Sequence, residues 1–189
     1  MRAITRKEEI VKTAAKLFKE KGYSAVTMRH IAAEMGIKAA SLYNHINSKQ
    51  DILNAIIISI AEEFTNGMKH ILSSEASCID KLKKIIQLHV KISSENIYGM
   101  ASLNNDWMHL EDQLDYYQKL RTDYENDFIS ILKEGIASGE IIDAKLDVMM
   151  FSILTTLRSL YLWIPKKEDI KLEELSQNLS QILIEGINN

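Results

Sequence analysis

The stretch TMRHIAAEMGIKAASLYNHINSK, from Thr27 to Lys49, decides the fold of the first part of this chain. Thr27 is suited to cap a helix whose apolar residues recur at three- and four-residue steps. Gly36 stands where a helix ends in a left-handed conformation. A second short helix, from about Lys38 to His45, places Leu42 on its inner side. Two short helices joined by a tight turn predict a helix-turn-helix, which presents its second helix to the major groove of DNA.

Capping signals mark the helices on either side of this stretch. Thr5 and Glu8 have the spacing of a capping box, and the helix that they open has an apolar stripe and ends at Gly22. Ser48 and Asp51 repeat the signal and open a long helix with apolar residues over about five turns. The first helix and the helix-turn-helix are therefore expected to form a three-helix head.

The rest of the chain also has helical periodicity. One proline and seven glycines in 189 residues leave few helix breakers, which favours an all-α chain. We expect about nine helices, with a DNA-binding domain at 1–48 and a C-terminal effector-binding and dimerisation domain at 49–189. The further helices are predicted at about 77–93, 97–110, 111–137, 144–163 and 172–187.

The composition points to a chain that stays inside the cell. Cys78 is the only cysteine, so the chain has no internal disulfide, and we expect this residue to be buried as a small apolar side chain. No run approaches the roughly 18–20 apolar residues of a membrane span. The first residues, MRAITRKEEI, lack the apolar core of a signal peptide. We predict a cytoplasmic protein with no membrane partner.

Charge is distributed unevenly along the chain. Residues 1–50 carry ten Lys or Arg and four Glu, a net charge of +6, whereas the remainder has a net charge of −9. A basic head on an acidic body suits a head that meets phosphate. A solvated basic helix is the alternative, and the neighbouring helix-turn-helix favours DNA binding.

The predicted helix at 144–163 is apolar nearly all round. Such a helix must be buried on every side, and the other helices of one subunit would cover only part of it. We expect a homodimer in which the last two helices pair across a two-fold axis. A helix that is central within one subunit is the alternative. A dimer also allows two heads to reach two half-sites of an operator.

The first 50 or so residues closely resemble the tetracycline-repressor (TetR) family of bacterial transcription regulators. Ile46 stands where many relatives have Phe, a core substitution that leaves the functional positions unchanged. The matching residues are Ile10, Ala14, Leu17, Phe18, Gly22, Tyr23, Thr27, Met28, Ile31, Ala32, Gly36, Ile37, the run SLYNHINSK at 41–49, and Leu53.

The resemblance implies a homodimeric repressor that binds a palindromic double-stranded operator and is released by a small effector. The C-terminal domains of the family are diverse. The run that begins WMHLEDQLDYYQKLRTDYENDF, at 107–128, is similar to a branch whose members respond to acyl-CoA or related lipid metabolites. An acyl-CoA or other lipid-like effector is therefore expected by analogy.

The resemblance places the DNA contacts on the recognition helix and its neighbours. Tyr43 and His45 are able to donate hydrogen bonds to phosphates, although packing within the head is the alternative for both. Asn44 is suited to pair with adenine, and Lys49 adds charge at a helix N-terminus. The predicted DNA-binding residues are Thr27, Arg29, Lys38, Ala39, Ala40, Ser41, Tyr43, Asn44, His45 and Lys49.

Methionines, aromatic residues and one arginine are candidates for the effector pocket. Residues of these types at helical spacing are more often plain core. Arg158 lies in an apolar helix, and we rank pairing with an acidic residue before a role across the dimer interface or on an anionic effector. The predicted pocket residues are Met100, Trp107, His109, Tyr117, Tyr124, Met150, Arg158 and Trp163, and we also considered Met108, Tyr116, Met149 and Phe151.

Two other functions remain alternatives. An architectural DNA-binding dimer would share the head but need no pocket. A helical-bundle enzyme is disfavoured because the chain has no glycine-rich phosphate loop, no GxSxG and no HExxH. Asp106-x-x-His109 is the nearest approach to a di-iron motif, and it occurs once. We therefore predict no enzyme activity, no cofactor and no metal site.

Overall fold

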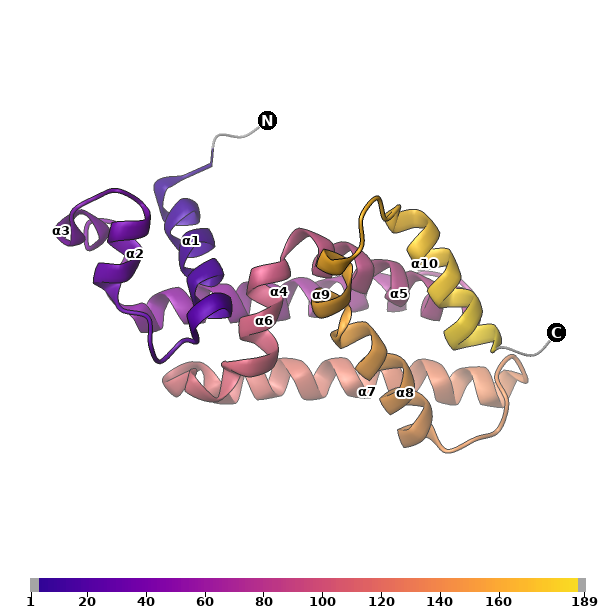
Figure 1. The fold of residues 1–189 in the computed structure, drawn as a ribbon. Coiled ribbons are helices and arrows are strands. Elements are labelled where there is room, and N and C mark those ends of the chain that lie inside the picture. The colour runs from indigo at the N-terminus through magenta and orange to yellow at the C-terminus, as the bar shows by residue number, and fades with distance from the viewer. Residues whose placement is uncertain (1–3, 187–189) are drawn as a thin grey trace. The chain divides into compact units, whose positions relative to one another are not determined.

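The computed structural model describes residues 4–186, a range that contains helices and turns but no strand (Figure 1). The expectation of an all-α chain with about nine helices is confirmed. Short 3₁₀ turns follow α6 and α9. The helices are α1 (Arg6–Lys21), α2 (Met28–Glu34), α3 (Ala39–Leu42), α4 (Lys49–Leu72), α5 (Cys78–Glu95), α6 (Ile97–Asn105), α7 (Leu114–Ser138), α8 (Leu146–Arg158), α9 (Leu160–Trp163) and α10 (Leu172–Ser180).

The chain divides into two compact units. The N-terminal unit joins Met1–Ala61 to Tyr98–Tyr117, and the C-terminal unit joins Glu62–Ile97 to Gln118–Asn189. Each unit is therefore built from two separate parts of the chain. The functional domains predicted at 1–48 and 49–189 are a different division and stay a prediction.

The predicted caps bound α1. The Thr5 hydroxyl oxygen accepts the N–H of Glu8 at 3.2 Å, and the Glu8 carboxylate accepts the N–H of Thr5 at 2.7 Å. This is the predicted capping box. Gly22 ends the helix with φ of 82°, and its N–H donates to the carbonyl of Phe18 at 2.8 Å. Side chains of α1 such as Ile10 and Phe18 are fully buried in the N-terminal unit.

The segment 98–117 packs onto the head within the N-terminal unit. Gly99 lets α6 approach α4 closely, because a Cβ at this position would lie 2.6 Å from Cδ1 of Ile60. Farther along, the Gln50 amide donates to the carbonyl of His109 at 2.7 Å. The rings of Tyr23 and His109 stack with their centroids 5.3 Å apart. Residues distant in sequence thus complete the core around the helix-turn-helix.

In the C-terminal unit, α8, α9 and α10 all pack on α5. Buried side chains of α5 and α7, including Ile85, Ile86 and Phe128, supply the core. Cys78 is 7% exposed at the start of α5, as expected for a small apolar side chain.

The single helix predicted at 144–163 is wrong, because it breaks at Ser159 into α8 and α9. Two hydroxyls before the break and one at the break bond to carbonyls of the preceding turn. Ser152 donates to Val148 at 2.8 Å, Thr156 to Ser152 at 3.0 Å, and Ser159 to Thr156 at 2.8 Å. Such back-bonding competes with the helical ladder and bends helices. The periodicity of the apolar residues does not reveal this break.

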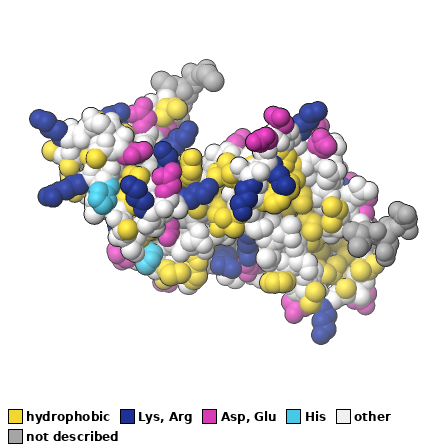
Figure 2. All heavy atoms as spheres, viewed as in Figure 1, with side chains coloured by type: hydrophobic (Ala, Val, Ile, Leu, Met, Phe, Trp, Pro, Cys, Tyr) yellow, Lys and Arg dark blue, Asp and Glu magenta, His cyan; other side chains and the backbone are white. Residues whose placement is uncertain are grey.

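Part of α8 and α9 lies on the surface of the C-terminal unit. Phe151 is 67% exposed and Leu162 is 49% exposed, so the alternative of a helix buried on all sides within one subunit is wrong. By length and composition alone, Leu146–Lys166 would be able to cross a membrane, and 33% of its apolar window is buried. Figure 2 shows apolar side chains on the surface of the part that holds α8–α10.

Candidate nucleic-acid interface

Thr27 caps α2 with help from a histidine. Its hydroxyl oxygen accepts the N–H of His30 at 3.2 Å, and Nδ1 of His30 accepts the N–H of Thr27 at 3.3 Å. His30 therefore takes the place that a glutamate has in the usual capping box. The ring is exposed beside Arg29, and its Nε2 is free to donate to a phosphate. His30 was not among the predicted DNA-binding residues, although its position three residues after the cap was the available signal.

The turn between the two helices depends on one glycine. Gly36 has φ of 66°, and a Cβ there would meet nothing within 4 Å, so the backbone conformation rather than space demands glycine. The N–H of Ile37 donates to the carbonyl of Ala32 at 3.0 Å, which closes the turn. The predicted left-handed position is confirmed.

The recognition helix is shorter than predicted. The regular α-helix α3 covers Ala39–Leu42, and residues 43–45 continue as a turn in which the N–H of His45 donates to the carbonyl of Leu42 at 2.9 Å. Leu42 is fully buried and fastens α3 to the core. Tyr43 is 53% exposed and both Asn44 and His45 are exposed, so packing within the head is excluded for Tyr43 and His45.

The predicted DNA-binding residues surround this surface. Arg29, Lys38 and Ala40 are exposed, whereas Ala39 and Ser41 are half-buried. Arg29 and Lys38 form no ion pair within the described range, so their charges are free for phosphate. Figure 2 shows several Lys and Arg side chains on the part of the molecule that holds α1–α3.

Lys49 is partly engaged inside the unit. Its ammonium donates to the carbonyl of Tyr23 at 3.0 Å and lies 4.1 Å from the centre of the Tyr23 ring. The Tyr23 hydroxyl in turn donates to the Gln50 amide oxygen at 2.9 Å. An ammonium has three donors, so two remain for phosphate oxygens. Lys49 is therefore oriented by the same tyrosine that stacks on His109.

Four of the predicted pocket residues lie in the N-terminal unit. Met100 is fully buried in the core. Trp107 stacks on Tyr117 with their ring centroids 6.0 Å apart, and the Tyr117 hydroxyl donates to the Leu103 carbonyl at 3.4 Å. His109 stacks on Tyr23, as described above. These side chains pack the unit together.

Tyr124 belongs to a buried polar pair of the C-terminal unit. Its hydroxyl lies 2.9 Å from Nε2 of His89, and both side chains are buried beside the ring of Phe64. Burial, with the positive charge of Arg158 adding to it, lowers the pKa of His89 to about 3. Burial also raises the pKa of Tyr124. His89 was not among the predicted residues, and the available signal was a polar residue in the apolar stripe of α5.

Arg158 has the partner type that we ranked first. Its guanidinium donates to the Glu125 carboxylate at 2.7 Å. Burial alone would raise the pKa of Glu125, but the hydrogen bonds and charges of Arg158 and Arg121 hold it below its ordinary value. Of the remaining candidates, Met150 is half-buried, and Trp163 is 43% exposed with the Lys167 ammonium 5.1 Å from its ring centre.

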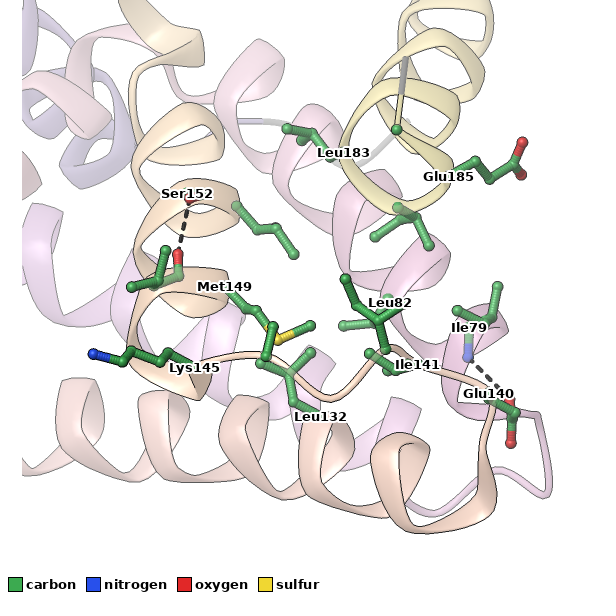
Figure 3. Close-up of a pocket in the computed structure, with 16 residues that line it drawn as sticks. Ile79, Leu82, Leu132, Glu140, Ile141, Lys145, Met149, Ser152, Leu183 and Glu185 are labelled. Atoms are coloured by element: carbon green, nitrogen blue, oxygen red, sulfur yellow. Dashed lines mark hydrogen bonds between the residues drawn. The ribbon is translucent and has the colours of Figure 1, made fainter. Parts of the chain in front are cut away.

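A pocket of about 790 Å³ lies in the C-terminal unit between α8 and the π-helical turn Gln181–Glu185 that continues α10 (Figure 3). It is called the pocket between α8 and α10. None of the eight predicted pocket residues lines it, and of the further candidates only Met149 does. The apolar pair Ile141 and Ile142 follows the helix-ending Gly139, and this pattern was the available signal for its outer wall. The lining residues are Ile79, Leu82, Leu132, Glu140, Ile141, Ile142, Ala144, Lys145, Val148, Met149, Ser152, Ile153, Leu183, Ile184, Glu185 and Gly186.

An exposed, cationic helix-turn-helix surface on an all-α scaffold defines a DNA-binding protein. Comparison with protein families agrees. Residues 10–56 match the model of the bacterial regulatory proteins of the tetR family, and residues 75–187 match a tetracyclin repressor-like C-terminal domain. The chain belongs to the TetR family and is a DNA-binding transcriptional regulator.

Similar proteins extend over nearly the whole chain. The HTH-type transcriptional repressor KstR2 of Mycolicibacterium smegmatis is 24% identical over 186 residues, which are 97% of this chain and 91% of the relative. The structure of the ketosteroid transcriptional regulator KstR2 of Mycobacterium tuberculosis superposes with a TM-score of 0.91 at 21% identity, over 100% of this chain and 97% of that one. The fatty acid degradation regulator FadR from Bacillus halodurans superposes with a TM-score of 0.71 at 19% identity, over the full length of both chains.

Proposed function

We propose that this protein is a repressor that binds a palindromic operator as a homodimer and is released from it by a small effector. The exposed surface of α2 and α3 carries this proposal. It combines free cations at Arg29 and Lys38 with exposed hydrogen-bonding side chains at 43–45, held in place by the buried Leu42. Cations and hydroxyls position a protein on phosphates, while side-chain amides distinguish bases.

The proposed contacts fall into two groups. Thr27, Arg29 and Lys49 lie at the starts of α2 and α4 and would meet phosphates, as would Tyr43 and His45. Asn44 is exposed and suited to pair with adenine in the major groove, while Ala40 would allow close approach to a thymine methyl. The full proposed set is Thr27, Arg29, Lys38, Ala39, Ala40, Ser41, Tyr43, Asn44, His45 and Lys49.

We place the dimer contact on the last two long helices, α8 and α10. Exposed apolar side chains on one subunit support this, chiefly Phe151 of α8 at 67% exposure and Ile182, after α10, at 55%. Apolar surface of this kind is stabilised when a second copy covers it. Two copies would offer two heads to the two halves of a palindrome.

For the effector we propose an acyl-CoA or another lipid-like metabolite. Two structural relatives support a hydrophobic effector through their names, which refer to ketosteroids and to fatty acid degradation. The apolar lining of the pocket between α8 and α10 supports the same class. A pocket of about 790 Å³ falls within the size range of small-molecule sites.

Selection of bound DNA from a random pool, with the full-length protein, tests the operator. We expect a palindrome whose half-sites lie about one helical turn or a multiple apart, bound by a protein of dimeric mass. Acyl-CoA esters of increasing chain length are then titrated into the complex, and we expect release of the DNA. A selected sequence without two-fold symmetry would contradict the dimeric operator. DNA binding that no ester or other lipid-like metabolite alters would instead favour the architectural alternative.

A further inference from the structure

The pocket between α8 and α10 is built from five parts of the C-terminal unit. Leu82 of α5 and Leu132 of α7 form its floor and are buried. Met149 of α8 lies on one side and Leu183, beyond α10, on the other. Ile141, in the loop after α7, closes the lower edge. Figure 3 shows these side chains gathered around one space.

The loop wall depends on a close approach to α7. A Cβ on Gly135 would clash with Cδ1 of Ile141 and lie 3.1 Å from Cβ of Cys78. The N–H of Ile141 also donates to the Gly135 carbonyl at 3.0 Å. Glycine at this position therefore lets the loop fold back against α7, which keeps Ile141 at the edge of the pocket instead of in its middle.

Apart from Lys145, the polar side chains of the lining are engaged by partners within the protein. The Glu140 carboxylate accepts the N–H of Ile79 at 3.4 Å and the hydroxyl of Ser138 at 3.2 Å. Glu185 pairs with Lys83 at 3.0 Å, and the Ser152 hydroxyl donates to the Val148 carbonyl at 2.8 Å. Apart from Lys145 at the rim, no charged side chain of the lining is free to donate a hydrogen bond, so an anionic group deep inside the pocket would lose its water without compensation. The interior therefore suits an aliphatic body.

One charged lining residue has no partner. Lys145 precedes α8 and is exposed, and the described residues include no ion pair with it. In Figure 3 its side chain points away from the pocket at the rim. A lysine stem has four flexible carbons, so the ammonium is able to swing toward a negative group at the mouth. The two acidic lining residues, Glu140 and Glu185, are engaged elsewhere.

The pocket and the proposed dimer contact use different faces of α8. The lining residues 145, 148, 149, 152 and 153 follow the spacing of one helix face. Phe151 and Thr155 are both exposed and lie about a quarter of a turn or more from the centre of that face. Val148 lies at the border and belongs to both. A second copy that covers Phe151 would therefore leave the floor of the pocket accessible to a ligand.

From these observations we propose that the pocket between α8 and α10 binds the aliphatic chain of an amphipathic anion, with its negative end at the mouth beside Lys145. This proposal rests on the proposed function, because it identifies the site of the effector and the part of the effector that the site recognises. One face of α8 lines the pocket and another face forms the proposed dimer contact. A ligand in the pocket and the partner subunit would therefore both contact this helix.

Calorimetric titration of the full-length protein with dodecanoate tests the pocket. Met149→Trp adds volume inside the lining and should weaken binding by about tenfold or more. Ser152→Phe adds volume at the exposed rim, where folding is less at risk, and should weaken binding in the same direction. Asn126→Trp is the control, because Asn126 is exposed on α7 and does not line the pocket. Its affinity for dodecanoate should equal that of the unaltered protein.

The charge of the ligand is tested by comparing dodecanoate with dodecanol. Lys145→Glu should weaken dodecanoate by about fivefold, the upper range for an exposed pair, and leave dodecanol unchanged. Lys133→Glu makes the same change of charge at an exposed position that does not line the pocket, and should affect neither ligand. Equal loss of both ligands in Lys145→Glu would overturn the placement of the negative end.

Three results would overturn the pocket itself. They are no binding of dodecanoate, binding that neither Met149→Trp nor Ser152→Phe weakens, and a loss of dimeric mass in these two variants, which would assign the pocket to the subunit interface. Release of operator DNA is measured separately. Binding that depends on the pocket without release would contradict ligand-released repression and leave the pocket intact. Release that the pocket variants do not alter would contradict the pocket alone.

Discussion

The surface of α2 and α3 and the pocket between α8 and α10 obtain their chemistry in different ways. The proposed DNA contacts all lie within the stretch 27–49, where caps and one left-handed glycine fix the backbone. The pocket draws on segments that begin at Ile79 and end at Gly186. Its shape depends on how far apart α8 and α10 lie on α5. The first site is therefore governed by local backbone chemistry and the second by packing between distant helices.

This contrast separates two kinds of sensitivity. In the helix-turn-helix, a change at a buried support such as Leu42 should disturb the surface directly above it. In the C-terminal unit, the packing of several helices determines both the burial of the His89–Tyr124 pair and the shape of the pocket. Substitutions in the two regions should consequently differ in what they alter. In the first region they should change the affinity for DNA as well as stability, and in the second only stability or its pH dependence.

Leu42→Ala should have the largest effect. Leu42 is fully buried, so its truncation leaves a cavity and lowers the free energy of unfolding by about 3 kcal/mol. Because Leu42 fastens α3, the folded fraction should also bind operator more weakly. Leu160→Ala is the matched control in the C-terminal unit, where Leu160 is 4% exposed. It should lose similar stability and keep the operator affinity of its folded fraction. Denaturant titration measures the stability of both variants, and binding isotherms measure their affinity for operator DNA. An equal loss of operator affinity in Leu42→Ala and Leu160→Ala would contradict the difference between the two regions.

His89 should produce the next largest effect, seen as a function of pH. The folded protein keeps His89 neutral down to about pH 3, whereas the unfolded chain takes up its proton near pH 6.5. The contribution of this residue to stability is therefore intact above pH 6.5 and is lost as the pH falls toward 3. Between pH 7 and 5 the loss is about 2 kcal/mol.

His89→Gln keeps an N–H group for Tyr124 but cannot take up a proton. Its free energy of unfolding should consequently fall by about 2 kcal/mol less than that of the unaltered protein between pH 7 and 5. His70→Gln is the control, because His70 is exposed, and should follow the unaltered protein. Parallel pH profiles for His89→Gln and the unaltered protein would show that burial does not hold His89 neutral.

Lys49→Ala should have the smallest effect on free energy. It should weaken binding on specific and random DNA alike and flatten the slope of log affinity against log salt by about one unit. It should also lower stability by about 0.5–1 kcal/mol, since the contacts with Tyr23 are lost. Lys38→Ala removes a charge without such contacts and should flatten the slope with little loss of stability. An unchanged slope in Lys49→Ala would confine this lysine to a structural role.

Much of the fold follows from signals that act within a few residues. Thr5 with Glu8 and Ser48 with Asp51 bond across three residues, and such pairs are visible in the sequence. Gly22 and Gly36 have positive φ where the helices were expected to end, and Gly139 has positive φ directly after α7. The same locality explains why most of the DNA-binding candidates lie exposed together. Short-range backbone chemistry needs no knowledge of the rest of the chain.

The pocket and the break in α8 depend on partners that the local sequence does not specify. Aromatic residues and methionine at helical spacing indicate a core, but they do not reveal which gaps between helices remain open. Tyr117, Tyr124 and Met100 became core, while the branched aliphatic residues Ile141 and Leu183 line the pocket. Arg158 was the exception, because the cost of an unpaired charge in an apolar helix required a partner, and Glu125 supplies it.

The stack of His109 on Tyr23 has a consequence for building hybrid regulators. The compact unit that contains the helix-turn-helix also contains Tyr98–Tyr117, so its module is discontinuous in the gene. A hybrid joined at 48/49 would set Tyr23 against foreign residues at positions 50 and 109, whereas a graft that carries 1–61 together with 98–117 keeps these contacts. Interchangeable parts in this protein follow spatial boundaries, and a single splice does not respect them.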